Sequence, residues 1–148
     1  MRRAAVAVLG AEYRGDDAVG PLVGERLRAA GVDVLDCGDE PTRLIEPFAG
    51  LDLVILVDAV RSGAAPGTVH RVEAHEGALP RDLGLASTHA VSVADALALA
   101  YALGRAPRQV VIVGIEGRAF GMGDPLTPEV ERAIGVATRE VLQMLERR

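Results

Sequence analysis

The sequence predicts an α/β fold, a three-layer sandwich in which a mostly parallel, twisted sheet of about five strands carries helices on both faces. Short runs of aliphatic and β-branched residues recur along the chain, which is typical of parallel strands that are buried on both faces. The stretches between these runs place apolar residues at helical spacing. Strands and helices therefore alternate, and right-handed crossovers are expected to connect the parallel strands.

The parallel strands are predicted from four apolar runs, at residues 4–9, 32–35, 53–57 and 110–113. Residues 68–73 alternate only weakly between apolar and polar side chains. This pattern suits an additional, antiparallel strand at an edge of the sheet.

Two helices, one before and one after residues 41–49, are predicted from the spacing of their apolar residues. One spans residues 19–30 and ends at Gly31, which suits the position after a helix C-terminus. The next runs over residues 89–103, with Ser87 or Thr88 as its N-cap. The face of this second helix that is expected to be buried consists of Val93, Ala94, Leu97 and Tyr101.

The last helix begins with Thr127 as N-cap and Pro128 as first helical residue. A helix within residues 41–49 is expected to be short or interrupted, because Pro47 would break it. The apolar stripe of the last helix consists of Val130, Ile134, Ala137, Val141 and Leu145.

The length and charge of the chain restrict what it can do. A chain of 148 residues without a linker-like segment suits one domain, residues 1–148. Its 21 acidic residues exceed its 16 basic ones, and no interior cluster of Lys and Arg appears, which argues against nucleic acid and membranes as partners.

A single cysteine and the lack of a signal-peptide pattern predict a cytoplasmic protein. That residue, Cys37, is expected to be a small buried side chain, whereas His70 and His75 are expected at the surface.

A ligand site is expected at the carboxyl ends of the parallel strands, where open α/β sheets bind their ligands. Asp17 follows the first strand, Asp58 ends the third, and chain direction brings the helix start near His89 to the same edge. Carboxylates without basic partners repel one another, and a bound cation relieves that repulsion. Two carboxylates and one imidazole suit a borderline divalent metal such as nickel or zinc.

Other interpretations of these residues are weaker or open. Asp16 and Asp17 could also serve as an acidic pair that stabilises the start of the first helix. The glycines after the first strand match neither dinucleotide-binding nor P-loop spacing, and neither a nucleophile elbow nor an H-E-x-x-H motif is present.

Five short segments in this order resemble the hydrogenase maturation endopeptidases, which trim the C-terminal extension from the precursor of the large subunit of nickel-iron hydrogenases. The segments are Glu12-Tyr13-Arg14-Gly15-Asp16-Asp17, Val57-Asp58-Ala59, Ser87-Thr88-His89, Gly114-Ile115-Glu116-Gly117 and Leu126-Thr127-Pro128-Glu129-Val130. The resemblance implies that Asp17, Asp58 and His89 contact a metal. It further implies that this metal is nickel already inserted in the precursor, so that cleavage follows correct loading.

The chain departs from the family pattern at two positions. Val8 and Ala11 stand where the family usually has the first glycine and the asparagine of Gly-x-Gly-Asn. Ala11 cannot contribute the side-chain amide that an asparagine would bring to this loop.

The residues leave the hydrolytic step and the function class open. Either a metal-bound water attacks, or a carboxylate, Asp17 or Asp16, acts as general base on water. Besides an endopeptidase, the sequence is compatible with a non-catalytic binding module or assembly chaperone that docks a metal-containing partner. A domain that binds a small molecule or nucleotide is a third interpretation.

Overall fold

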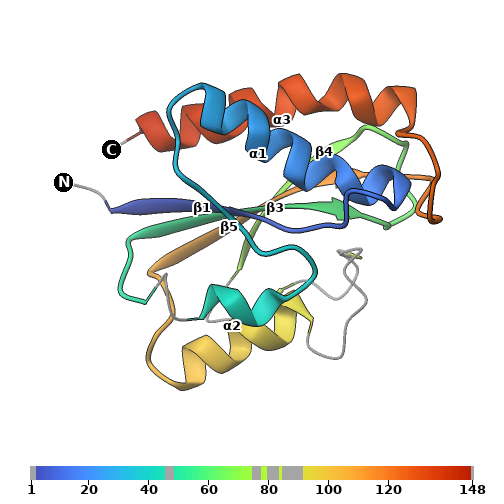
Figure 1. The fold of residues 1–148 in the computed structure, drawn as a ribbon. Coiled ribbons are helices and arrows are strands. Elements are labelled where there is room, and N and C mark those ends of the chain that lie inside the picture. Colours follow the sequence, from blue (N-terminus) through green and yellow to red (C-terminus); the bar gives the residue numbers. More distant parts are fainter. Residues whose placement is uncertain (1–2, 46–48, 75–77, 80–83, 85–91, 148) are drawn as a thin grey trace.

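The computed structural model describes residues 3–45, 49–74, 78–79, 84 and 92–147, and Figure 1 shows their arrangement. One five-stranded sheet with the order β2-β1-β3-β5-β4 forms the centre. Its β4 is antiparallel to β5, and the other neighbours are parallel. The strands are β1 (Ala4–Val8), β2 (Val34–Asp36), β3 (Leu53–Val60), β4 (Val69–Ala74) and β5 (Gln109–Glu116).

Helices cover both faces of this sheet, which confirms the predicted three-layer α/β fold. Figure 1 shows α1 and α3 on one face and α2 on the other. The helices are α1 (Val19–Ala29), α2 (Val93–Ala102) and α3 (Pro128–Glu146), with short 3-10 helices η1 (Gly15–Ala18) and η2 (Pro41–Leu44). Among the helices of the described residues, none combines the length and apolarity that crossing a membrane requires.

The two faces of the sheet bury separate apolar clusters. Val8, Val57 and Val113 pack toward α1 and α3, whereas their chain neighbours Ala7, Leu56 and Ile112 pack toward α2 and η2. This alternation follows from the two-residue period of a strand, which sends successive side chains to opposite faces. Both faces are buried, so the central strands read as continuous apolar runs in the sequence.

The strands β3 and β5 extend further than predicted. They remain paired beyond their apolar runs, through Asp58 opposite Gly114 and on to Val60 opposite Glu116. Asp58 therefore lies inside a strand and is fully buried. The prediction ended the two apolar runs before Asp58 and before Gly114, although backbone pairing does not depend on the side chain at either position.

The predicted start and buried face of α2 are wrong. The helix begins at Val93, and its N-cap is Ser92, whose hydroxyl accepts a hydrogen bond from the Asp95 amide at 3.1 Å. Asp95 in turn accepts one from the Ser92 amide, which completes a capping box. The buried face is also shifted around the helix from the predicted one, and Ala94 and Tyr101 are exposed. Its buried residues are Val93, Ala96, Leu97 and Ala100.

The other predicted helices agree with the structure. Helix α1 ends before Gly31, which has a φ of +87°, and α3 begins with Pro128 after Thr127. The apolar stripe of α3 is buried at Val130 and Ile134 and continues to its C-terminal half. The helix predicted within residues 41–49 is short, as expected, because only η2 forms there among the described residues; Pro47 lies outside them.

Candidate active site

The start of α1 lies directly against the ends of β1 and β3. This close approach depends on Gly20, where an added Cβ atom would collide with the carbonyl oxygen of Leu9 and come within 3.0 Å of that of Val57. The residues just before the helix, in η1, are thereby brought to the carboxyl edge of the sheet. This is the edge where open α/β sheets place their ligands.

Asp17 is a buried acidic residue of η1 at this edge, with 8% of its surface exposed. Its Oδ2 accepts a hydrogen bond of 2.9 Å from the backbone amide of Ala11, in the loop that follows β1. The carboxylate is therefore oriented by the loop that it faces. A fixed direction is what a metal ligand or a general base requires.

Asp58 is a second buried acidic residue, on β3 between β1 and β5. Its Oδ1 accepts a hydrogen bond of 2.8 Å from the amide of Ala59. Burial of a carboxylate among apolar strands is costly unless hydrogen bonds or a cation compensate. Because η1 packs against β3, the structure brings Asp17 and Asp58 to one region of the sheet edge.

The third predicted ligand, His89, lies outside the described residues, as do Ser87, Thr88 and His75. Within the ranges that the structure does describe, no group of three or more His, Cys, Asp or Glu side chains is placed to hold a metal ion. The described part of the predicted metal site thus consists of the two carboxylates.

The Asp16 carboxylate, unlike that of Asp17, accepts hydrogen bonds from the distant segment 118–127. It is completely buried, and its Oδ2 accepts hydrogen bonds from the amides of Arg118 at 2.7 Å and Ala119 at 2.9 Å. Thr127 donates twice more, from its amide to Oδ1 at 2.7 Å and from its hydroxyl to Oδ2 at 2.6 Å. Oδ2 therefore accepts three hydrogen bonds and Oδ1 accepts one.

These hydrogen bonds decide the ionisation of Asp16. Burial is the largest single influence and raises the pKa of its carboxyl, but the hydrogen bonds from Ala119, Thr127 and Arg118 together outweigh it and lower the pKa. Asp16 is therefore held as a carboxylate by four hydrogen bonds, three of them to Oδ2.

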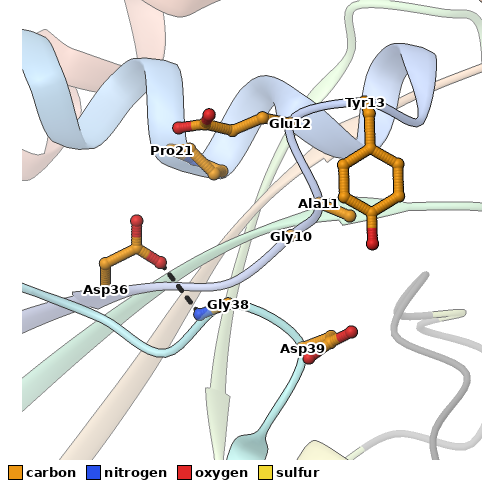
Figure 2. Close-up of a pocket in the computed structure, with 8 residues that line it drawn as sticks. All are labelled: Gly10, Ala11, Glu12, Tyr13, Pro21, Asp36, Gly38 and Asp39. Carbon is orange, nitrogen blue, oxygen red and sulfur yellow. Dashed lines mark hydrogen bonds between the residues drawn. The ribbon is translucent and has the colours of Figure 1, made fainter. Parts of the chain in front are cut away.

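A pocket of about 270 Å³ lies between the loop after β1 and the loop after β2 (Figure 2), and Asp17 is not among the described residues that line it. Ala11, whose amide binds Asp17, lines it, so the pocket and that carboxylate share one loop. Asp36, one of its acidic residues, accepts a hydrogen bond of 2.8 Å from the Gly38 amide. The lining residues are Gly10, Ala11, Glu12, Tyr13, Pro21, Asp36, Gly38 and Asp39.

A cluster around Glu116 at the same sheet edge was missed from the sequence. Glu116 is 1% exposed, and its Oε1 accepts hydrogen bonds from the Ser62 hydroxyl at 2.5 Å and from His70 Nε2 at 3.0 Å. Its Oε2 accepts the amides of Ser62 at 2.9 Å and Gly63 at 3.3 Å. Burial raises its pKa most, yet the hydrogen bonds from Ser62 and His70, joined by that of Gly63, outweigh it and lower the pKa.

His70, expected at the surface, is only partly exposed, since 24% of its side chain is accessible and it pairs with Glu116. In the antiparallel register His70 stands opposite Gly114, and Glu116 is two residues further on the same face of β5. Because Gly114 has no side chain, the imidazole reaches past it. In the sequence, Glu116 stands two positions after Gly114, but this spacing indicates a contact with His70 only once the pairing of β4 with β5 is known.

Cys37 is a buried free thiol, as predicted. Burial, reinforced by the charge of Asp36 and partly offset by Arg43, raises the pKa of the thiol to about 11. The thiol is therefore protonated at neutral pH and is no nucleophile.

Comparison with known proteins decides the family. The family profile described as hydrogenase maturation protease (HycI) matches residues 19–144, which is well over half of the chain. The chain belongs to this family. The matched span includes Asp58 and position 89, whereas Asp16 and Asp17 lie just before it.

Relatives and solved structures agree with the hydrogenase maturation protease family. The hydrogenase 2 maturation protease of Escherichia coli K12 is 30% identical over 137 residues, which cover 88% of this chain and 82% of that protein. HupD of Thiocapsa roseopersicina, a hydrogenase expression/formation protein, is 32% identical over 120 residues, 79% of this chain and 53% of that one. The chain likewise spans less than two thirds of HupM of Azotobacter chroococcum and HoxM of Azotobacter vinelandii.

The fold of the chain matches that of a solved family structure. The hydrogenase maturating endopeptidase HybD from E. coli superposes with a TM-score of 0.79 and 28% identity, over 98% of this chain and 92% of HybD. The five-stranded, mostly parallel sheet and its helices thus follow the HybD fold.

Proposed function

We propose that this chain is an endopeptidase that removes the C-terminal extension of a nickel-iron hydrogenase large-subunit precursor after nickel insertion. The observation that carries the proposal is the pair of buried carboxylates, Asp17 on η1 and Asp58 on β3, at the ligand-binding edge of a maturation-protease fold. The E. coli relative named as hydrogenase 2 maturation protease supports a proteolytic activity toward such a client.

The donor set suits recognition of nickel that arrives with the precursor. Asp17 and Asp58 would supply carboxylate oxygens, and His89 would supply an imidazole nitrogen. Backbone amides of Ala11 and Ala59 orient the two carboxylates. Three ligands without a thiolate leave coordination positions open, so a metal held by soft ligands of the substrate could be shared between substrate and protease.

Sharing the metal would make affinity depend on nickel loading. A precursor without nickel would lack the bond to Asp17, Asp58 and His89 and would bring its own ligands near two carboxylates of this protein. Discrimination between the two forms is then a difference of two binding free energies. The order of maturation, insertion before cleavage, follows from that difference.

Asp17 is the better of the two neighbouring acids for a direct role in hydrolysis. The carboxylate oxygens of Asp16 already accept four hydrogen bonds, whereas Asp17 accepts one from the amide of Ala11, a residue that lines the pocket. Where a carboxylate rather than a metal-bound water takes the proton, we assign this role to Asp17, and to the pocket a place for the polypeptide of the precursor.

The test is cleavage of a purified precursor, followed by mass spectrometry of its C-terminus. The wild-type protein is expected to shorten the nickel-loaded precursor and to leave the nickel-free precursor intact. Asp58→Asn and His89→Ala should abolish the mass change while the circular dichroism spectrum of the fold is retained. Glu116→Gln serves as the control, since it alters a buried carboxylate at the same edge outside the proposed ligand set.

Three outcomes would overturn the proposal. Cleavage of both precursor forms would remove the role of nickel, and full activity of both ligand variants would remove the assigned residues. Binding of the loaded precursor without any mass change would instead identify a docking protein or assembly chaperone.

A further inference from the structure

We infer that Asp16 is a positioning residue, which fixes the direction of Asp17 and the course of the loop 117–127 without touching the substrate itself. The inference rests on the proposed function, because it concerns how that site is held. It assigns separate tasks to two adjacent aspartates that are alike in sequence.

The Asp16 side chain joins both ends of the loop between β5 and α3. The amides of Arg118 and Ala119 lie at the start of this loop, and Thr127 lies at its end, immediately before α3. All of these donors are more than a hundred positions away in sequence, by 102, 103 and 111 residues. One buried carboxylate thus closes the loop and attaches it to η1.

The hydroxyl of Thr127 shows that this attachment is specific. Thr127 occupies the N-cap position of α3, where a threonine normally accepts a hydrogen bond from the first turn of its own helix. No such side-chain bond forms at this cap, and the hydroxyl donates instead to Asp16 Oδ2 at 2.6 Å. The Thr127 hydroxyl therefore binds Asp16 and does not cap the first turn of α3.

The backbones of the two segments also touch. The Asp16 amide donates to the Ala119 carbonyl at 2.7 Å, and the Gly123 amide donates to the Tyr13 carbonyl at 2.8 Å. A Cβ atom at Gly15 would collide with the Ala119 carbonyl oxygen, so this residue has to be small for the segments to meet. Residues 13–16 and the loop 117–127 are therefore held against each other along their length.

This contact reaches Asp17 through the backbone of η1. Asp17 follows Asp16 in the same turn, its amide donates to the Arg14 carbonyl at 3.1 Å, and its carboxylate is bound by the Ala11 amide. Fixing Asp16 therefore fixes the point from which the Asp17 side chain leaves the backbone. A displacement of about 1 Å at a reacting group can reduce a rate by about a hundredfold.

The same contact holds the segment that carries Tyr13, an exposed residue that lines the pocket of Figure 2. Loosening the contact is expected to disturb the Asp17 carboxylate and this side of the pocket together.

The test uses Thr127, because its hydroxyl can be removed while Asp16 and Asp17 are left intact. Thr127→Val deletes the donor at nearly constant volume, and Thr127→Ser restores it. Val141→Ala is the matched control, since it removes volume from a fully buried position of α3 about 20 Å further along the helix. Each variant is measured for urea stability, for affinity toward the nickel-loaded precursor, and for the single-turnover rate of the bound precursor.

Thr127→Val is expected to slow the single-turnover rate at least about tenfold with little change in affinity, and Thr127→Ser should recover most of that rate. Val141→Ala should stay within about twofold of the wild-type rate although its stability falls. A wild-type rate in Thr127→Val, or an equal loss of rate in Val141→Ala, would overturn the inference.

Amide hydrogen exchange at Ala11 separates this inference from the proposed function. Its amide is bound to Asp17, so it reports the position of that carboxylate without any substrate. Faster exchange at Ala11 in Thr127→Val, but not in Thr127→Ser or Val141→Ala, would support the inference even if the wild-type protein cleaved no precursor and the proposed function failed. Unchanged exchange in Thr127→Val would refute it.

Discussion

At the carboxyl edge of the sheet, Asp16 and Glu116 each hold a loop with four hydrogen bonds, but the groups that donate to them differ. Asp16 accepts three backbone amides and one hydroxyl from the loop between β5 and α3. Glu116 accepts two backbone amides, one hydroxyl and one imidazole nitrogen, from the start of the β3–β4 connection and from β4. Both carboxylates are buried, and both have a lowered pKa.

The kind of donor determines whether a buried carboxylate can be replaced by a carboxamide. A backbone N–H can only donate, whereas a hydroxyl or a neutral imidazole can donate or accept. At Glu116 one oxygen takes both backbone amides and the other takes the two adaptable groups. At Asp16 backbone amides point at both oxygens, so neither position tolerates an NH₂ group.

The largest effect is expected for Asp16→Asn. In either orientation the carboxamide NH₂ would face at least one backbone N–H, which leaves buried donors unsatisfied. We expect a loss of about 3 kcal/mol in the free energy of unfolding, measured by urea denaturation. A loss below about 1 kcal/mol would mean that the loop 117–127 rearranges easily and that the contrast with Glu116 is wrong.

A smaller effect is expected for Glu116→Gln at neutral pH. The new carboxamide oxygen can accept the amides of Ser62 and Gly63, while its NH₂ donates to the Ser62 hydroxyl and to His70 Nε2 in the other tautomer. The unfolding free energy should fall by less than about 1 kcal/mol in the same urea assay. A loss as large as that of Asp16→Asn would show that the adaptable partners do not adapt.

The smallest effect is expected in how the difference in unfolding free energy between the wild type and Glu116→Gln changes with pH. The pKa of Glu116 is lower in the folded protein than its ordinary value of 4.5, so its stabilising contribution is complete above that value and is lost as the pH falls through the lowered folded pKa. The carboxamide introduced by Glu116→Gln does not titrate. The stability gap between the wild type and Glu116→Gln should therefore narrow as the pH falls below 4.5. Urea midpoints at successive pH values below 4.5 test this, and a gap that widens there would contradict the direction of the pKa shift.

Much of the fold was predictable because its signals are local. Continuous apolar runs identified the buried strands, weak alternation identified β4 at the edge, and Gly31 and Pro128 marked helix ends. The start of α2 was predicted wrongly although its capping box, Ser92 with Asp95, is also local. The sequence therefore contained the capping signal, but the N-cap was predicted at Ser87 or Thr88 instead of Ser92.

The candidate site was predictable only to the level of which acids reach the sheet edge. Topology brings the residues after β1 and those of β3 together, so Asp17 and Asp58 could be selected before their contacts were known. The Glu116 cluster was not predictable in this way. It depends on the pairing of β4 with β5, which sets His70 beside a glycine and within reach of Glu116.

The sequence by itself determined the order of strands and helices and the acidic character of one sheet edge, because both follow from periodicity and chain direction. Only the tertiary structure decided the difference between Asp16 and Asp17, which are adjacent and chemically identical. The groups that donate to Asp16 belong to Arg118, Ala119 and Thr127, more than a hundred residues away. Hydrogen bonding over such a separation is fixed by packing and leaves no pattern in the local sequence.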